Sequence, residues 1–165
     1  MRAIRHLFDL SSAKRHFPPA TLDAIQHAIA ASEHRHRGEI AFAVEGNLPF
    51  AEVLRSRGAR GARERAHAAF ARLRVWNTEH NTGVLVYLLL ADHAIEIVAD
   101  RGIAAKVDEA QWQPICALMQ KHFSAGDYER GAIAGVDAIG ELLIRHFPAN
   151  GERNLDELPD RPVVL

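Results

Sequence analysis

Hydrophobic positions along the chain follow two periods, one typical of helices and one typical of strands. After Pro18-Pro19, apolar residues spaced three and four apart predict a helix that ends before Gly38. From Glu39 to Glu45, apolar residues occupy alternate positions, which predicts a strand. Further apolar stripes predict helices over residues 62–75, 109–123 and 128–147.

Two apolar runs, residues 83–90 and 94–99, are separated by Ala91-Asp92-His93 and predict a β-hairpin. We predict that Leu90 pairs with Ile95, which leaves apolar side chains on both sides of the first strand. Such a strand is expected inside a sheet that helices cover on both faces. The predicted fold is therefore α/β, a three-layer α/β/α sandwich around a small mixed sheet.

The sequence divides into a central domain with a segment at each end. The domain is predicted over residues 19–147. Residues 1–18 are basic, with apolar residues at helical spacing, so they predict a short surface helix. Membrane contact through this segment stays open, although one or two turns bury little area. Residues 148–165 are polar and proline-bearing, which predicts a flexible tail or a strap, with docking of Val163-Val164-Leu165 on a groove as the alternative.

Composition narrows the class of protein. The 165 residues fit one domain, and 25% charged with 48% apolar residues is typical of a soluble globular chain. The net charge of -1 gives no electrostatic reason to expect a nucleic-acid partner. The longest apolar run is far shorter than the roughly 20 residues of a transmembrane helix. The N-terminus also lacks the features of a signal peptide. We therefore expect a cytoplasmic protein.

Cysteine, histidine and tryptophan suggest packing or solvent-facing positions rather than chemistry. Cys116 is the one cysteine, and its apolar helical neighbours predict a buried structural thiol. The ten histidines include His34 and His36, which point in different directions on a helix and do not suit zinc. We expect the histidines to face solvent. Trp76 and Trp112 are expected to pack, with a place in an ion pocket as the alternative for Trp76.

Three segments together resemble the motifs of TPM domains. They are the opening of the central strand, Asn81-Thr82-Gly83-Val84-Leu85-Val86, the first strand with its leading Glu39, and the turn and helix opening over residues 123–131. TPM domains occur in a thylakoid-lumen acid phosphatase, a photosystem-repair protein and many bacterial envelope proteins. Two departures stand out. No signal peptide or membrane anchor is seen, and Asp100-Arg101-Gly102-Ile103 replaces a glycine-rich segment.

Oxygen-bearing side chains are predicted to converge at one end of the sheet. A parallel first strand brings Glu39 near Asn81, the hairpin returns Asp100 to the same edge, and a short connection leaves Asp108 close by. Carboxylate and amide oxygens suit Ca²⁺ or Mg²⁺. The resemblance points the same way, because some TPM domains bind calcium near these loops. Structural roles stay open: Asp108 as a helix cap, Asn81 in a turn bond and Asp100 in an ion pair.

These features favour a non-catalytic binding or assembly module that holds a divalent ion and meets a protein partner, with no organic cofactor. The alternative, which the resemblance implies, is a metal-dependent acid phosphatase acting on phosphomonoesters. Arg101 is the candidate anion-binding residue, because phosphate chemistry needs positive charge beside the developing oxygens. The sequence has no glycine-rich phosphate loop, and no catalytic residues are assigned.

Overall fold

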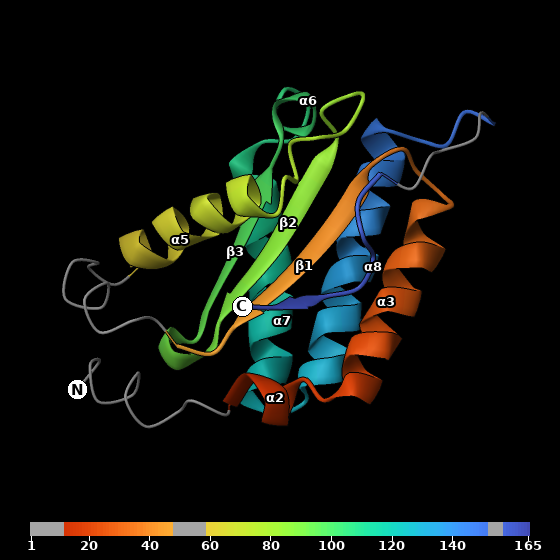
Figure 1. The fold of residues 1–165 in the computed structure, drawn as a ribbon. Coiled ribbons are helices and arrows are strands. Elements are labelled where there is room, and N and C mark those ends of the chain that lie inside the picture. The colour runs from red at the N-terminus through yellow and green to blue at the C-terminus, as the bar shows by residue number, and fades with distance from the viewer. Residues whose placement is uncertain (1–11, 48–58, 152–156) are drawn as a thin grey trace.

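The sheet is mixed and small. The computed structural model describes residues 12–47, 59–151 and 157–165. Within these residues, four strands form one sheet in the order β3-β2-β1-β4 (Figure 1). Strand β1 (Glu39–Glu45) runs parallel to β2 (Gly83–Leu89) and to β4 (Val163–Val164), whereas β3 (Ala94–Ala99) is antiparallel to β2.

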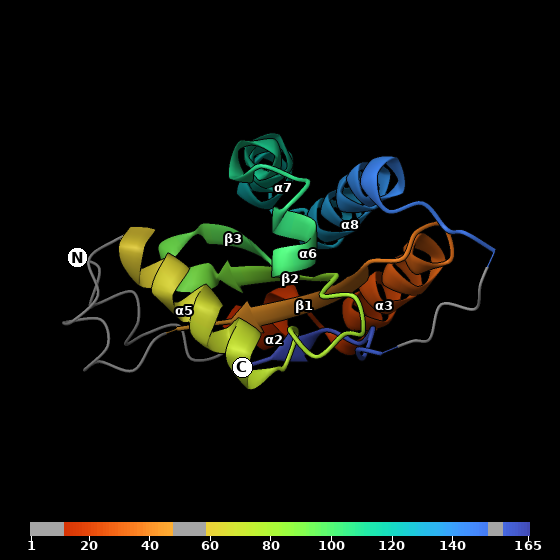
Figure 2. The ribbon, with the colours of Figure 1, turned by 90° about the horizontal axis from the view of Figure 1, so that it is seen from above.

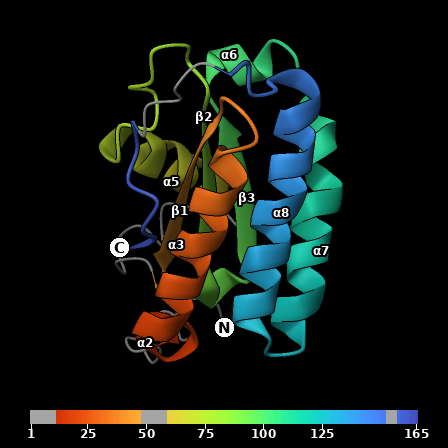
Figure 3. The same ribbon diagram turned by 90° about the vertical axis from the view of Figure 1, so that its right-hand side faces the viewer.

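Helices lie on both faces of the sheet. Helix α5 (Ala59–Arg72) covers one face, and α7 (Gln113–Ser124) and α8 (Tyr128–His146) cover the other (Figure 2). Helix α3 (Pro19–Glu33) packs beside α8, which in turn packs beside α7 (Figure 3). The three-layer α/β/α prediction is therefore confirmed. The shorter helical elements are α2 (Ser12–His16), η1 (Leu90–Asp92), α6 (Arg101–Ala104) and η2 (Glu109–Trp112).

Strand β2 separates two apolar cores, because its side chains alternate between the faces. The core shared with α3, α7 and α8 contains Val84, Val86 and Leu88, and the core under α5 contains Leu85, Tyr87 and Leu89. All seven β2 residues are buried, as expected for an internal strand covered on both sides. The prediction that this strand carries apolar side chains on both sides is therefore confirmed.

The predicted hairpin pairing is wrong by two residues. Ile95 pairs with Leu88, not with Leu90. The reason is that Leu90–Asp92 form a 3-10 turn and His93 takes a left-handed conformation with φ 51°, so the connection uses more residues than predicted. A shift of two leaves every side chain on its predicted face. It also moves Asp100 from the level of Leu85 to the end of the strand.

The C-terminal residues complete the sheet. Val163 and Val164 pair with Ala43 and Val44 of β1, and the Leu165 N–H donates to the Val44 carbonyl at 2.8 Å. We call residues 157–165 the strap. Leu158 anchors it in the core under α5, where the residue is 6% exposed. The last residues therefore add an edge strand to the sheet, rather than docking on a groove.

The structure corrects or confirms the predictions for four single residues. His36 does not face solvent: it is fully buried, its Nδ1 accepts the Gly38 N–H at 3.2 Å, and burial lowers its pKa to about 4. Trp76 is 50% exposed rather than packed, whereas Trp112 is buried as expected. Cys116 is half-buried, and burial raises the pKa of its thiol to about 11.

The apolar residues that predict a short helix near the N-terminus lie within residues 1–11, outside the described residues; α2 begins directly after them. Across the described ranges, no helix is both long and apolar enough to cross a membrane.

Candidate functional site

Asn81, Asp100 and Arg101 come together at one end of the sheet, and we call them the Asp100 site. The Asp100 N–H donates to the Gly83 carbonyl at 2.8 Å, which places it where β3 ends beside the start of β2. Arg101 Nε donates to Asn81 Oδ1 at 2.9 Å. The sequence prediction that Asn81 and Asp100 share an edge is confirmed by this geometry.

Local sequence holds the turn before β2 against α6. Asn81 has φ 56°, a left-handed conformation that asparagine adopts more readily than most residues. Its carbonyl accepts the Gly102 N–H at 3.0 Å. A Cβ at Gly102 would lie 2.6 Å from the carbonyl oxygens of both His80 and Asn81, so only glycine allows this approach. The turn and the start of α6 therefore form one rigid unit.

Asp100 is the N-cap residue of α6 and is 9% exposed. Its Oδ1 accepts the Arg101 N–H at 2.7 Å. Its Oδ2 is buried and has no hydrogen-bond partner among the described residues. A buried carboxylate oxygen without a donor costs free energy, so the site is expected to recruit water or a cation. The predicted pairing of Asp100 with Arg101 involves the backbone N–H.

Glu39 and Asp100 lie on opposite sides of Gly83: Glu39 of β1 pairs with it, and the Asp100 N–H donates to its carbonyl. A Cβ at Gly83 would lie 2.0 Å from the Val75 carbonyl oxygen, so the Val75 backbone fills the space over Gly83, between the two acidic residues. Glu39 is 1% exposed, and its Oε2 accepts the N–H groups of Glu157 at 3.2 Å and Leu158 at 3.3 Å. The structure thus directs Glu39 towards the strap.

Asp108 caps a helix, which is the structural role that the sequence offered as an alternative to ion binding. It is the N-cap residue of η2, and Gln111 Oε1 accepts its backbone N–H at 3.0 Å. This arrangement positions the start of the helix that continues into α7. It accounts for Asp108 without an ion.

A cluster of carboxyl groups was not found from the sequence. Glu33, at the end of α3, is buried, and its Oε1 accepts the Ile40 N–H at 2.6 Å. Burial, followed by the nearby carboxyls of Glu39 and Asp160, raises the pKa of Glu33 to about 9. Glu33 and Asp160 are 127 positions apart in the chain. No local signal could have joined them before the path of the strap was known.

The donor set at the Asp100 site is sparse. Among the described residues, no three His, Cys, Asp or Glu side chains gather as a metal site would need. A cation beside Asp100 would therefore be held by one carboxylate and by neutral oxygens such as Asn81 Oδ1, with water completing the shell. Oxygen donors of this kind fit a hard cation, and Mg²⁺ commonly keeps several waters in protein sites.

Comparisons with known proteins agree with this fold. A family model described as the TPM domain matches residues 13–142. The NMR structure of the BA42 protein from the psychrophilic bacterium Bizionia argentinensis is similar, with a TM-score of 0.76 and 27% sequence identity. The alignment covers 88% of this chain and 93% of that chain. A search of the curated proteins gives no match.

Proposed function

The chain belongs to the TPM domain family, and from that premise we propose that it is a non-catalytic binding module that takes up a divalent cation at the Asp100 site. The observation that carries this proposal is the buried Oδ2 of Asp100, which lacks a hydrogen-bond partner among the described residues. A cation next to this oxygen would offset the free-energy cost of its burial.

The residues present fit a hard cation with a largely aqueous shell. Asp100 supplies a carboxylate and Asn81 an amide oxygen, which are ligand types of Ca²⁺ and Mg²⁺. Arg101 Nε donates to the same amide oxygen, so its positive charge competes with the cation. Few protein ligands and a nearby arginine together predict weak binding. A bound cation would screen the Asp100 charge and present water ligands to a protein partner.

Thermal unfolding with Ca²⁺, with Mg²⁺ and with chelator tests the proposal. A cation that binds the folded chain raises the melting temperature as occupancy increases. Asp100→Asn is the informative variant, because asparagine keeps the N-cap acceptor and removes the charge. Asp108→Asn is the matched control, since Asp108 also occupies an N-cap position.

We expect a concentration-dependent shift in the wild-type protein and in Asp108→Asn, and no shift in Asp100→Asn. If neither ion shifts the wild-type protein at tens of millimolar, the cation proposal is wrong. An equal shift in Asp100→Asn would place the cation elsewhere.

The phosphatase alternative has one supporting observation. Arg101 follows Asp100 directly and is exposed, so a guanidinium lies beside the proposed cation, as phosphate chemistry requires. Turnover of a chromogenic phosphomonoester with added Mg²⁺ decides between the functions. We expect none above a no-protein control. Turnover that Asp100→Asn abolishes would favour the phosphatase over the non-catalytic module.

A further inference from the structure

The strap contacts the turn next to the Asp100 site through Glu157. Its carboxylate accepts the Glu79 N–H, with distances of 2.9 Å to Oε1 and 3.2 Å to Oε2. Its own N–H donates to Glu39 Oε2 at 3.2 Å. Glu157 therefore connects the start of β1 to the turn before β2.

That turn carries Asn81. The Asn81 N–H donates to the Thr78 carbonyl at 3.2 Å, and Thr78 Oγ1 accepts the Thr82 N–H at 2.8 Å, so residues 78–82 are tied to one another. From the other side, the Asn81 carbonyl accepts the Gly102 N–H. The turn is thus held by α6 on one side and by Glu157 on the other.

We propose that Glu157 is a positioning residue for the Asp100 site, which holds the turn so that the Asn81 amide oxygen stays within reach of a cation beside Asp100. This inference rests on the proposed function. Glu157 and the rest of the strap lie outside residues 13–142, which the family model matches, whereas Glu79 and Asn81 lie inside them. Because coupling between two binding events is reciprocal, cation binding should also favour the docked strap.

Titration of the full chain with Mg²⁺ and Ca²⁺ tests the inference in three variants. Glu157→Ala removes the acceptor for the Glu79 N–H, and we expect the cation affinity to fall about threefold to tenfold, the range that corresponds to one lost hydrogen bond. Glu157→Gln keeps an oxygen acceptor and should restore most of the affinity.

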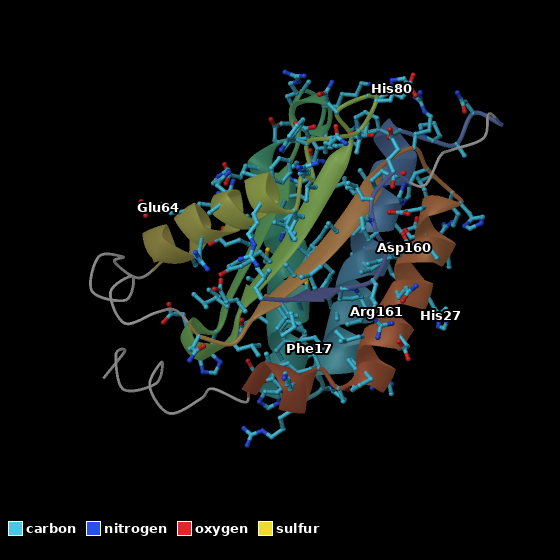
Figure 4. All side chains as sticks on the ribbon, in the orientation of Figure 1. Phe17, His27, Glu64, His80, Asp160 and Arg161 are labelled. Carbon is cyan, nitrogen blue, oxygen red and sulfur yellow. The ribbon has the colours of Figure 1, made fainter. Side chains whose placement is uncertain are left out.

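Arg161→Ala is the control within the same strap. Arg161 Nη1 donates to Asp23 Oδ1 at 2.6 Å and to Gln26 Oε1 at 3.2 Å, both on α3. Figure 4 shows Arg161 along α3, away from His80 in the turn at the top of the sheet. We expect this variant to leave the cation affinity unchanged.

Amide hydrogen exchange without any cation separates this inference from the proposed function. We expect the Gly102 and Thr82 amides to exchange faster in Glu157→Ala than in the wild-type protein and Arg161→Ala. Wild-type exchange rates in Glu157→Ala would overturn the inference, even if the cation binds. If Glu157→Gln binds the cation as weakly as Glu157→Ala, charge rather than position is responsible, and the inference is also wrong. Absence of cation binding in every variant, with faster exchange in Glu157→Ala, would instead reject the proposed function and leave the positioning of the turn supported.

Discussion

Glu39 and Asp100 flank Gly83 on opposite sides, and both are almost fully buried. Glu39 receives two N–H groups from the strap on a single oxygen. Asp100 receives one N–H on Oδ1, while Oδ2 has no partner among the described residues. The chain therefore supplies donors to the first carboxylate, whereas one oxygen of the second has none among the described residues.

This comparison suggests a structural role for Glu39 and makes Asp100 the functional candidate. Donors from the chain's own backbone offset the cost of burying a polar oxygen, and such a group needs no ligand. A buried oxygen without a donor among the described residues, next to an exposed arginine, can gain from binding. Sequence position alone does not distinguish the two, since both residues were predicted as ligands.

Gly83→Ala should lower the free energy of unfolding most, because its side chain would displace the Val75 backbone that lies over Gly83. The added Cβ would lie 2.0 Å from the Val75 carbonyl oxygen, and this backbone cannot rotate away as a side chain can. We expect the free energy of unfolding to fall by about 3 kcal/mol or more, measured by chemical denaturation.

Gly38→Ala is the control for that substitution. Its Cβ would lie 2.9 Å from a side-chain carbon of Leu143, which can shift, so the loss should be clearly smaller. If both variants lost the same free energy of unfolding, the Val75 backbone would be as easily displaced as the Leu143 side chain.

Glu39→Ala should be next in size, because it removes the acceptor of two backbone N–H groups in a buried place. Each unsatisfied buried donor costs about 1–3 kcal/mol, and the Glu157 N–H is only part-buried, so we expect a loss of about 2–4 kcal/mol in the free energy of unfolding. Glu39→Gln keeps an oxygen acceptor and should lose much less. An alanine variant as stable as the wild-type protein would show that the strap does not depend on Glu39.

Glu33→Gln tests whether the cluster around Glu39 retains a proton. The pKa of Glu33 is raised from 4.5 to about 9, so the folded chain holds a proton that the unfolded chain releases. The resulting stabilisation is complete below pH 4.5 and declines as the pH rises towards 9, by at most about 1.4 kcal/mol per pH unit.

Denaturation between pH 7 and 9 measures this decline. Glutamine does not titrate and keeps an acceptor for the Ile40 N–H, so the variant should show a flatter profile than the wild-type protein. His36 does not interfere in this range, because its pKa is lowered from 6.5 to about 4 and its contribution changes only at lower pH. Parallel profiles for the two proteins would show that Glu33 is ionised in the fold.

Asp100→Asn in chelator should have the smallest effect. Asparagine preserves the acceptor for the Arg101 N–H and removes a buried charge, so the free energy of unfolding should stay within about 1 kcal/mol of the wild-type value. A large loss under these conditions would give Asp100 a structural role like that of Glu39.

The fold was largely predictable because its signals are local. The alternation from Glu39 to Glu45 and the doubly apolar run from Gly83 fixed the faces of two strands, and the helical stripes placed the layers. The hairpin register was missed because a 3-10 turn followed by a left-handed histidine has no distinctive spacing. Asp92-His93 looked like a tight turn.

Only part of the site was predictable, because several of its contacts join segments that are far apart in the chain. Asn81 and Asp100 are brought together by hairpin geometry, which pattern reasoning can follow. The sequence also predicted Glu39 as part of the same site. It does not reveal that the Val75 backbone lies over Gly83, because Val75 belongs to an irregular segment between α5 and β2. Glu157 and Asp160 depend on the path of the strap, which apolar periodicity does not describe.

The most direct test of the central claim is an NMR titration of the ¹⁵N-labelled full chain with Mg²⁺ and then Ca²⁺. We predict saturable shifts at the amides of Asn81, Arg101 and Gly102, smaller or no shifts at Glu39 and Asp108, and loss of the saturable shifts in Asp100→Asn. If the amides around Asp100 do not respond, or respond equally in Asp100→Asn, then Asp100 does not hold a cation and the contrast with Glu39 has no functional meaning.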